Sequence, residues 1–176
     1  SEETILPEGA LVPLPEHLSW EEAGTLTCAG VTAWHGLVER GGLKAGDTVL
    51  LLGTGGVSIA ALQIARAMGA RVIITSSSDK KLERARALGA TDVINYRTSP
   101  NWGAEVLALT KGRGVDHVVE VGGPGTLGQS LQAVRVGGNV ALIGVLTGRG
   151  GEVPTSLLMA KQARLQGLVV GSRRQQ

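Results

Sequence analysis

The stretch Thr48-Val-Leu-Leu-Leu-Gly53-Thr-Gly55-Gly56-Val57-Ser58-Ile-Ala-Ala-Leu-Gln-Ile-Ala-Arg-Ala-Met68-Gly69 decides the fold of this 176-residue chain. It begins with an apolar run that is too short to span a membrane and then enters a glycine-rich turn. After the turn, apolar residues recur at helical spacing, at Val57, Ala60, Ala61, Ile64, Ala65 and Met68. The pattern predicts a strand, a tight turn and a helix.

The turn has the chemistry of a phosphate-binding site. Gly53 can adopt a positive φ, Gly55 allows phosphates to approach the backbone, and the free N–H groups at the start of the helix can bind an anion. The G-x-G-x-x-G pattern of dinucleotide-binding domains has Ser58 in place of its third glycine here. The turn alone leaves two interpretations open, a dinucleotide-binding turn or an ordinary strand-to-helix turn of an α/β domain.

The composition indicates a globular domain with an aliphatic core. Hydrophobic residues make up 43% of the chain, glycine occurs 27 times and phenylalanine is absent, which suits buried parallel strands of Val, Leu, Ile and Ala. The 17 basic and 15 acidic residues nearly balance, and the basic ones are scattered except for Arg173-Arg174, so nucleic acid is not an indicated partner. Without a membrane-length apolar run or a secretory signal, we expect a cytoplasmic protein with no membrane partner.

The N-terminal part of the chain predicts a lead-in followed by helices. Residues 1–18 contain three of the six prolines and predict an extended lead-in, and the domain that carries the glycine turn is expected at residues 19–176. Ser19-Trp20-Glu21-Glu22 matches a capping box and predicts the start of a helix. After a looser pattern at 24–28, a helical segment is expected from Cys28 to Arg40, where Gly41-Gly42 ends it.

From Asp47 onward, strands and helices alternate with short joints. Strands are expected at 48–52, 71–75, 92–96, 115–121, 139–144 and 165–171, and helices at 57–68, 80–88, 100–110, 126–134 and 155–162. We expect Ser76–Asp79 to cap the second of these helices and Pro100 to occupy the first turn of the third. The predicted fold is α/β, a doubly wound six-stranded parallel sheet of order 3-2-1-4-5-6 with right-handed crossovers.

The end of the second expected strand bears on the choice of cofactor. In NAD-binding domains an acidic residue about 20 positions beyond the turn holds the ribose 2′-hydroxyl. Ser76 stands there in this chain, followed by Ser77, Lys80 and Lys81. Hydroxyls and lysines would accept a 2′-phosphate, so NADP(H) is favoured over NAD(H). The alternative is a helix cap followed by solvated charges.

Other nucleotide and catalytic chemistries find little support. The chain has no G-x-x-x-x-G-K-[ST] motif, and Tyr96 is followed four residues later by Pro100 rather than by the lysine of short-chain reductases. His17, His35 and His117 form no evident group with a serine and an acid. The single cysteine, Cys28, excludes an internal disulfide, and a metal site would need other ligands.

Four segments in this order resemble the medium-chain dehydrogenase/reductase superfamily of zinc-type alcohol dehydrogenases and quinone oxidoreductases. They are Cys28-Ala-Gly30-Val31-Thr32-Ala-Trp34, residues 41–49, Gly53-Thr-Gly-Gly-Val57 and residues 88–96. The resemblance covers about residues 10–172 and implies the cofactor domain alone. The catalytic GroES-like domain and the returning C-terminal segment of that family would lie outside this chain, so we expect the chain by itself to be inactive.

The resemblance also implies roles for individual residues in orienting the cofactor for hydride transfer. Its assignments, by position in this sequence, are the pyrophosphate at Gly53, Gly55, Gly56, Val57 and Ser58; the adenosine end at Ser76, Ser77, Lys80 and Lys81, with Tyr96 beside it; and the nicotinamide at Thr32, Val121, Gly122, Gly144 and Val145.

Cys28 has two interpretations. A single cysteine on a helix is most often a small buried hydrophobic residue. The resemblance implies instead that it is the third ligand of a catalytic zinc, four residues before Thr32, with the other two ligands in the domain outside this chain. Such a metal would polarise an alcohol or carbonyl oxygen. The serines at 58 and 76 keep the zinc-free branch of the superfamily open.

Three functions are therefore consistent with the sequence. The first is the cofactor domain of an NADP(H)-dependent alcohol dehydrogenase or carbonyl reductase acting on a small molecule. The second is a zinc-free quinone or enoyl reductase, and the third is a non-catalytic NADP(H)-binding module. The resemblance further implies a homodimer in which the strand at 165–171 pairs with its twin.

Overall fold

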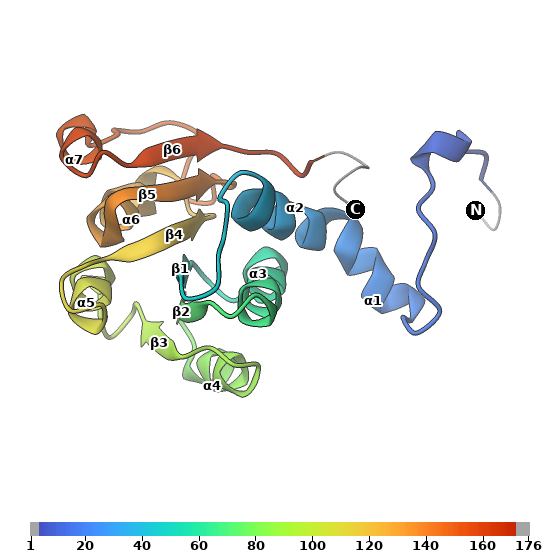
Figure 1. The fold of residues 1–176 in the computed structure, drawn as a ribbon, viewed down its shortest axis with the longest axis horizontal. Coiled ribbons are helices and arrows are strands. Elements are labelled where there is room, and N and C mark those ends of the chain that lie inside the picture. The colour runs from blue at the N-terminus through green and yellow to red at the C-terminus, as the bar shows by residue number, and fades with distance from the viewer. Residues whose placement is uncertain (1–3, 172–176) are drawn as a thin grey trace.

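The computed structural model describes residues 4–171 and contains a six-stranded sheet with helices on both faces (Figure 1). The strand order is β3-β2-β1-β4-β5-β6, and every neighbouring pair is parallel. The predicted fold class and strand order are confirmed.

The elements follow the predicted alternation. The strands are β1 (Thr48–Leu51), β2 (Arg71–Ser76), β3 (Asp92–Asn95), β4 (Val115–Glu120), β5 (Val134–Leu142) and β6 (Arg164–Gly167). The helices that follow them are α3 (Gly56–Ala67), α4 (Asp79–Ala87), α5 (Trp102–Leu109), α6 (Pro124–Ala133) and α7 (Thr155–Ala160).

The sheet has a core on each face because side chains alternate along its strands. On β1, Val49 and Leu51 pack with the core that includes α3 and α4 residues, while Leu50 packs with the core that includes α5 and α6 residues. All three side chains are completely buried. Burial on both faces explains why the central strand is a continuous apolar run rather than an alternating one.

The helical segment before the sheet begins as predicted. The Ser19 hydroxyl accepts the Glu22 N–H at 3.2 Å and the Glu22 carboxylate accepts the Ser19 N–H at 3.0 Å, which completes the capping box. The path continues unbroken through α1 (Trp20–Thr25), the π-helical η2 (Leu26–Gly30), α2 (Val31–Trp34) and the π-helical η3 (His35–Glu39). The looser sequence pattern at 24–28 therefore leads into a wider helical turn and not a break.

Two helix starts differ from prediction. α5 begins at Trp102 rather than at Pro100, because Asn101 is its N-cap and the Pro100 carbonyl accepts the Gln129 side chain at 3.0 Å. α6 begins at Pro124, two residues before the predicted Thr126. Proline suits this first helical position because the N–H that it lacks would have no partner there.

Two strands and one cap also differ. β5 begins at Val134 instead of Asn139, because Val134 already pairs with Val115 before a register shift. β6 ends at Gly167, so the predicted strand at 165–171 is wrong in its second half. At α4 the N-cap is Ser78, within the predicted capping segment 76–79, but its side chain makes no capping hydrogen bond.

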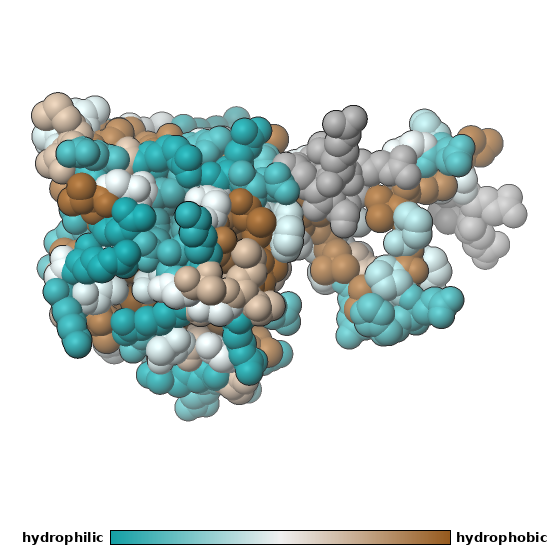
Figure 2. Space-filling model, viewed as in Figure 1, coloured by the Kyte–Doolittle hydropathy of each residue, from teal (hydrophilic) through white to brown (hydrophobic). Residues whose placement is uncertain are grey.

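The segment before α1 lies outside the sheet. It contains one short helix, η1 (Glu8–Ala10), and stands apart from the body of the domain with hydrophobic side chains on its surface (Figure 1, Figure 2). Among these, Ile5 is 99% exposed. Within residues 4–171, no helix is long and apolar enough to cross a membrane.

Asp116 ties together the amino ends of three central segments. This 2% exposed carboxylate accepts the Thr48 N–H at 2.8 Å, two bonds from Arg113 at 2.9 and 2.7 Å, and one from Arg135 at 2.5 Å. Burial opposes its ionisation, but the hydrogen bonds from Arg113, Thr48 and Arg135 outweigh burial and hold the pKa of Asp116 well below its usual range.

We predict that Asp116→Asn lowers the free energy of unfolding at pH 7 by on the order of 2 kcal/mol, because it removes the buried charged acceptor that the partly exposed Arg113 and Arg135 side chains share. Because the folded-state pKa of Asp116 is depressed, its contribution is complete above the unfolded-state pKa and is lost as the pH falls below it. The difference from wild type should thus be constant between about pH 5 and pH 8 and shrink below about pH 4.

Chemical denaturation across this pH range measures the effect. Glu83→Gln, which removes an exposed carboxylate from α4, is the control and should leave stability nearly unchanged. A difference between Asp116→Asn and wild type that does not shrink in acid would contradict the assignment.

Candidate dinucleotide-binding site

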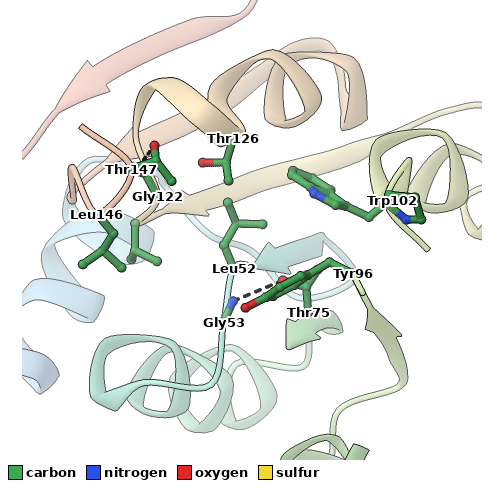
Figure 3. A pocket seen from close by; sticks show the side chains of 11 residues that line it. Leu52, Gly53, Thr75, Tyr96, Trp102, Gly122, Thr126, Leu146 and Thr147 are labelled. Carbon is green, nitrogen blue, oxygen red and sulfur yellow. Dashed lines mark hydrogen bonds between the residues drawn. The ribbon is translucent and has the colours of Figure 1, made fainter. Parts of the chain in front are cut away.

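The candidate site lies where the sheet topology changes direction. β1 has β2 on one side and β4 on the other, so the chain leaves β1 in one direction and later returns on its opposite side. The carboxyl ends of β1 and β4 therefore open a crevice, the usual ligand position in such sheets. A cleft of about 400 Å³ lies here, lined by Leu52, Gly53, Thr75, Tyr96, Pro100, Trp102, Val121, Gly122, Thr126, Leu146 and Thr147 (Figure 3).

The glycines of the turn each meet a different steric need. Gly53 has φ +72°, and its N–H donates to the Thr75 hydroxyl at 3.1 Å across to β2 (Figure 3). A Cβ on Gly55 would meet nothing within 4 Å, so its approach from outside is open. A Cβ on Gly56 would lie 3.3 Å from the Ala29 Cβ, so this glycine allows α3 to pack closely on the preceding helix.

The start of α3 supplies backbone donors. Gly55 is the N-cap, and its carbonyl accepts the Ile59 N–H at 2.9 Å, which leaves the amides of Gly56, Val57 and Ser58 as the first-turn donors that no helical carbonyl can reach. These amides and the helix dipole favour an anion at this position.

Ser58 has a structural role that the motif did not indicate. Its side chain is 2% exposed, and the hydroxyl donates to the Leu52 carbonyl at 2.7 Å. The hydroxyl thereby fastens the first turn of α3 to the end of β1. Only the backbone amide of Ser58 is left to serve the predicted pyrophosphate contact.

The predicted adenosine-end residues lie at the end of β2 and the start of α4. Ser76 is 3% exposed and its hydroxyl shares a 3.1 Å hydrogen bond with the Thr54 hydroxyl. Ser77 is half-buried, whereas Lys80 and Lys81 are exposed. The Ser76 hydroxyl therefore holds Thr54 of the glycine turn. The groups that a ligand can reach more easily are the Ser77 hydroxyl and the ammonium groups of Lys80 and Lys81.

One side of the cleft is an aromatic and proline wall. Figure 3 shows Tyr96 and Trp102 at the end of the cleft opposite Leu146 and Thr147. Tyr96 was predicted, whereas Pro100 and Trp102 were missed. The Gln129 side chain of α6 holds this wall, because it donates to the Pro100 carbonyl at 3.0 Å and accepts the Gly103 N–H at 2.9 Å. The sequence signal that could have indicated Pro100 and Trp102 as cleft residues was their position shortly after the third strand, β3.

Two of the residues assigned to the nicotinamide line the cleft and three do not. Val121 and Gly122 are lining residues. A Cβ on Gly144 would lie 2.2 Å from the Val121 carbonyl oxygen. A glycine is therefore required here for the segments that follow β4 and β5 to lie this close together. Val145 lines a neighbouring hollow of about 160 Å³, and Thr32 is buried in α2 with its hydroxyl donating to the Cys28 carbonyl at 2.6 Å.

A loop after β5 completes the cleft wall and was missed by sequence reasoning. The Thr147 hydroxyl donates to the Gly122 carbonyl at 2.8 Å and accepts the Gly125 N–H at 2.7 Å. These bonds hold the loop against the start of α6. They also set Leu146, which is 83% exposed, at the mouth of the cleft.

Cys28 offers one exposed thiol on η2. Its exposure contradicts the interpretation of a buried hydrophobic residue. Across residues 4–171, no group of three or more His, Cys, Asp or Glu side chains could hold a metal ion. The described part of the chain can thus contribute one zinc ligand but not a complete site.

The parallel sheet, the glycine turn and the cleft at the switch point define a Rossmann-type dinucleotide-binding domain. Residues 56–176 match the family described as zinc-binding dehydrogenase, and the chain belongs to this family within the medium-chain dehydrogenase/reductase superfamily. The resemblance in the sequence is thereby confirmed.

Individual relatives agree with this membership. A zinc-type alcohol dehydrogenase-like protein of Schizosaccharomyces pombe is 47% identical over 96% of this chain and 50% of its own length. The crystal structure of a candidate alcohol dehydrogenase from Sinorhizobium meliloti 1021 has a TM-score of 0.92 and 51% identity, covering 98% of this chain and 50% of its own. The chain therefore spans about half the length of such relatives.

Solved relatives differ in cofactor. One described as an NAD-dependent alcohol dehydrogenase has 42% identity and a TM-score of 0.85, covering 92% of this chain and 47% of its own. A mycobacterial relative complexed with NADPH has 31% identity and a TM-score of 0.86, and the match covers 94% of this chain and 51% of the relative. Family membership alone leaves the cofactor of this chain undecided.

We predict that Gly53→Ala and Gly46→Ala each lower the free energy of unfolding by roughly 1 kcal/mol, because both glycines have positive φ, +72° and +86°. A Cβ at either position meets nothing within 4 Å, so the two variants carry matched strain without a clash. Only Gly53 lines the cleft.

Dinucleotide titration combined with thermal melting separates a loss of cofactor binding from a loss of stability. Gly53→Ala should weaken binding several-fold, whereas Gly46→Ala, in the turn before β1, should bind as wild type does. Equal loss of binding in both variants would show that the turn acts only through stability.

Proposed function

We propose that the protein containing this chain transfers hydride between NADP(H) and an alcohol or carbonyl substrate, and that this domain holds the cofactor. The observation that carries the proposal is the cleft at the β1/β4 switch point, whose lining includes Gly53 of the turn that leads into α3. The nicotinamide cofactor supplies the hydride chemistry when bound. The chain's own residues bind the phosphates, orient the ring and keep water from the apolar walls.

The end of β2 supports the preference for NADP(H). Ser76 lies where a carboxylate would bind a 2′-hydroxyl, and its buried hydroxyl is engaged with Thr54. Lys81 and Arg84 line a hollow of about 190 Å³ between α3 and α4, so Arg84 adds a third cation to the two predicted lysines. The nearby Asp79 carboxylate accepts the Asn95 amide at 2.7 Å, so it already has a partner on β3. This charge distribution favours a 2′-phosphate.

Zinc enters the proposal only through Cys28. The exposed thiol could contribute one thiolate ligand once the rest of the protein supplies the others. Zinc in such a site acts as a Lewis acid on the substrate oxygen. If the rest of the protein lacks cysteine and histidine or glutamate ligands, the zinc-free quinone or enoyl reductase becomes the better interpretation.

The non-catalytic alternative makes a different prediction. A module that only binds NADP(H) would bind the cofactor but show no turnover with alcohols, carbonyls or quinones in the full-length protein. Turnover with any of these substrates would exclude it.

We predict that the chain binds NADPH more tightly than NADH. Lys81→Ala should weaken NADPH binding by about three- to tenfold and leave NADH binding nearly unchanged, because only NADPH carries the 2′-phosphate. Fluorescence titration of both reduced cofactors measures this. Lys44→Ala, an exposed lysine in the turn before β1, is the matched control for loss of charge. Tighter binding of NADH by wild type would refute the NADP(H) proposal.

The edge strand β6 supports the proposed homodimer. It is the last strand of the sheet and pairs only with β5 among the described strands. The Leu168 N–H donates to the Leu142 carbonyl at 2.9 Å, so the N–H of the preceding Gly167 points away from β5. A second copy of β6 would satisfy this outward donor.

We predict that Gly167→Pro, which removes the outward N–H, shifts the protein from dimer to monomer in sedimentation experiments. A Cβ at Gly167 meets nothing within 4 Å, so Gly167→Ala is a control that keeps the donor and should remain a dimer. A wild-type protein that stays monomeric across a wide concentration range would contradict the homodimer.

A further inference from the structure

Glu120, the last residue of β4, is a fully buried carboxylate that the proposed binding roles do not use. Its Oε1 accepts the Gly122 N–H at 2.7 Å, the Gly123 N–H at 3.1 Å and the Thr126 hydroxyl at 2.6 Å. Its Oε2 accepts the Ser130 hydroxyl. Two backbone amides that can only donate, together with two hydroxyls, suit an ionised carboxylate, which is purely an acceptor.

This negative charge has no cationic partner in the described structure. The salt bridges found between residues 4 and 171 involve Asp47, Asp92 and Asp116, and none involves Glu120. The contrast with Asp116, which is equally buried but held by two arginines, is clear. Hydrogen bonds offset part of the desolvation cost of Glu120, but its net charge is left uncompensated.

The charge lies directly behind the cleft wall. Gly122 and Thr126 both donate to the Glu120 carboxylate and both line the cleft (Figure 3). Gly122 is also held on its carbonyl side by Thr147, so the wall cannot readily move away from the charge. The carboxylate is therefore one hydrogen bond away from the space that a ligand would fill. Because Glu120 is completely buried, only the protein wall and no solvent lies between the carboxylate and the surface of the cleft, which limits screening along this path.

We propose that the Glu120 charge makes this cleft favour the oxidised, positively charged nicotinamide ring over the reduced, neutral ring. The inference rests on the proposed function, with the nicotinamide at the Val121–Gly122 end of the cleft. The phosphates and both riboses are common to NADP+ and NADPH, so their interactions with Glu120 cancel in the ratio of the two dissociation constants. The interaction of Glu120 with the charge of the nicotinamide ring is therefore the part that still affects this ratio.

This preference has a chemical consequence for hydride transfer. A bound reduced nicotinamide would supply a hydride, which is one hydrogen with two electrons, to the substrate carbon and would thereby become a cation. An uncompensated carboxylate behind the wall stabilises that cation relative to the neutral ring. Glu120 thus acts as a positioning residue for the loop and as an electrostatic bias toward hydride donation.

The test compares dissociation constants for NADP+ and NADPH, measured by titration calorimetry and fluorescence on the 176-residue chain. Glu120→Gln should raise the ratio of the NADP+ constant to the NADPH constant by about three- to tenfold. Glu120→Asp keeps the charge and should keep the wild-type ratio even if both constants rise. Ser130→Ala removes one donor but not the charge, so it should change both constants by the same factor.

A second neutral variant, Glu120→Ser, covers the case in which Glu120→Gln does not fold, because its smaller side chain leaves room for water to bond the loop amides. A wild-type ratio in a folded neutral variant would overturn the electrostatic inference. If wild type binds neither NADP+ nor NADPH, the proposed function itself fails. Binding of both forms with an unchanged ratio in the neutral variant overturns only the role of Glu120.

Discussion

The sharp exit from β1 is the constraint on which the rest of the site depends. β1 ends at Leu51 and α3 begins at Gly56, so the chain must turn within a few residues for α3 to pack back against the sheet. Gly53 makes the turn at positive φ, and two bonds hold it: its N–H to Thr75 and the Ser58 hydroxyl to the Leu52 carbonyl. The turn thereby aims the amino end of α3 at the crevice between β1 and β4.

The two ends of β4 use buried carboxylates in different ways. Asp116, at the amino end, forms salt bridges with two arginines and joins three segments of the sheet, which is a stabilising role. Glu120, at the carboxyl end, is surrounded by neutral donors and holds the loop that forms the cleft wall. A buried carboxylate thus has cationic partners where the fold is held together and only neutral donors where a ligand is expected.

Local patterns predicted most of the fold and part of the site. The alternation of apolar runs with helical spacing placed all six strands, and the capping box at Ser19 was confirmed. Errors arose where a distant residue decides the local structure. Gln129 captures the Pro100 carbonyl and delays the start of α5, and pairing with Val115 extends β5 back to Val134. Neither partner can be identified from the neighbouring sequence.

The sequence by itself determined the glycine turn, the order of strands and helices and the family, because these depend on residue periodicity, backbone freedom and matched motifs. Only the tertiary structure decided which side chains surround the cleft. Trp102, Thr126 and Thr147 come from three separate segments and converge because parallel strands bring their carboxyl ends to one edge of the sheet. Glu120 and Gly122 are only two residues apart, but the Thr147 hydroxyl that holds Gly122 in the cleft wall comes from the loop after β5, 25 residues away, and only the fold brings it there.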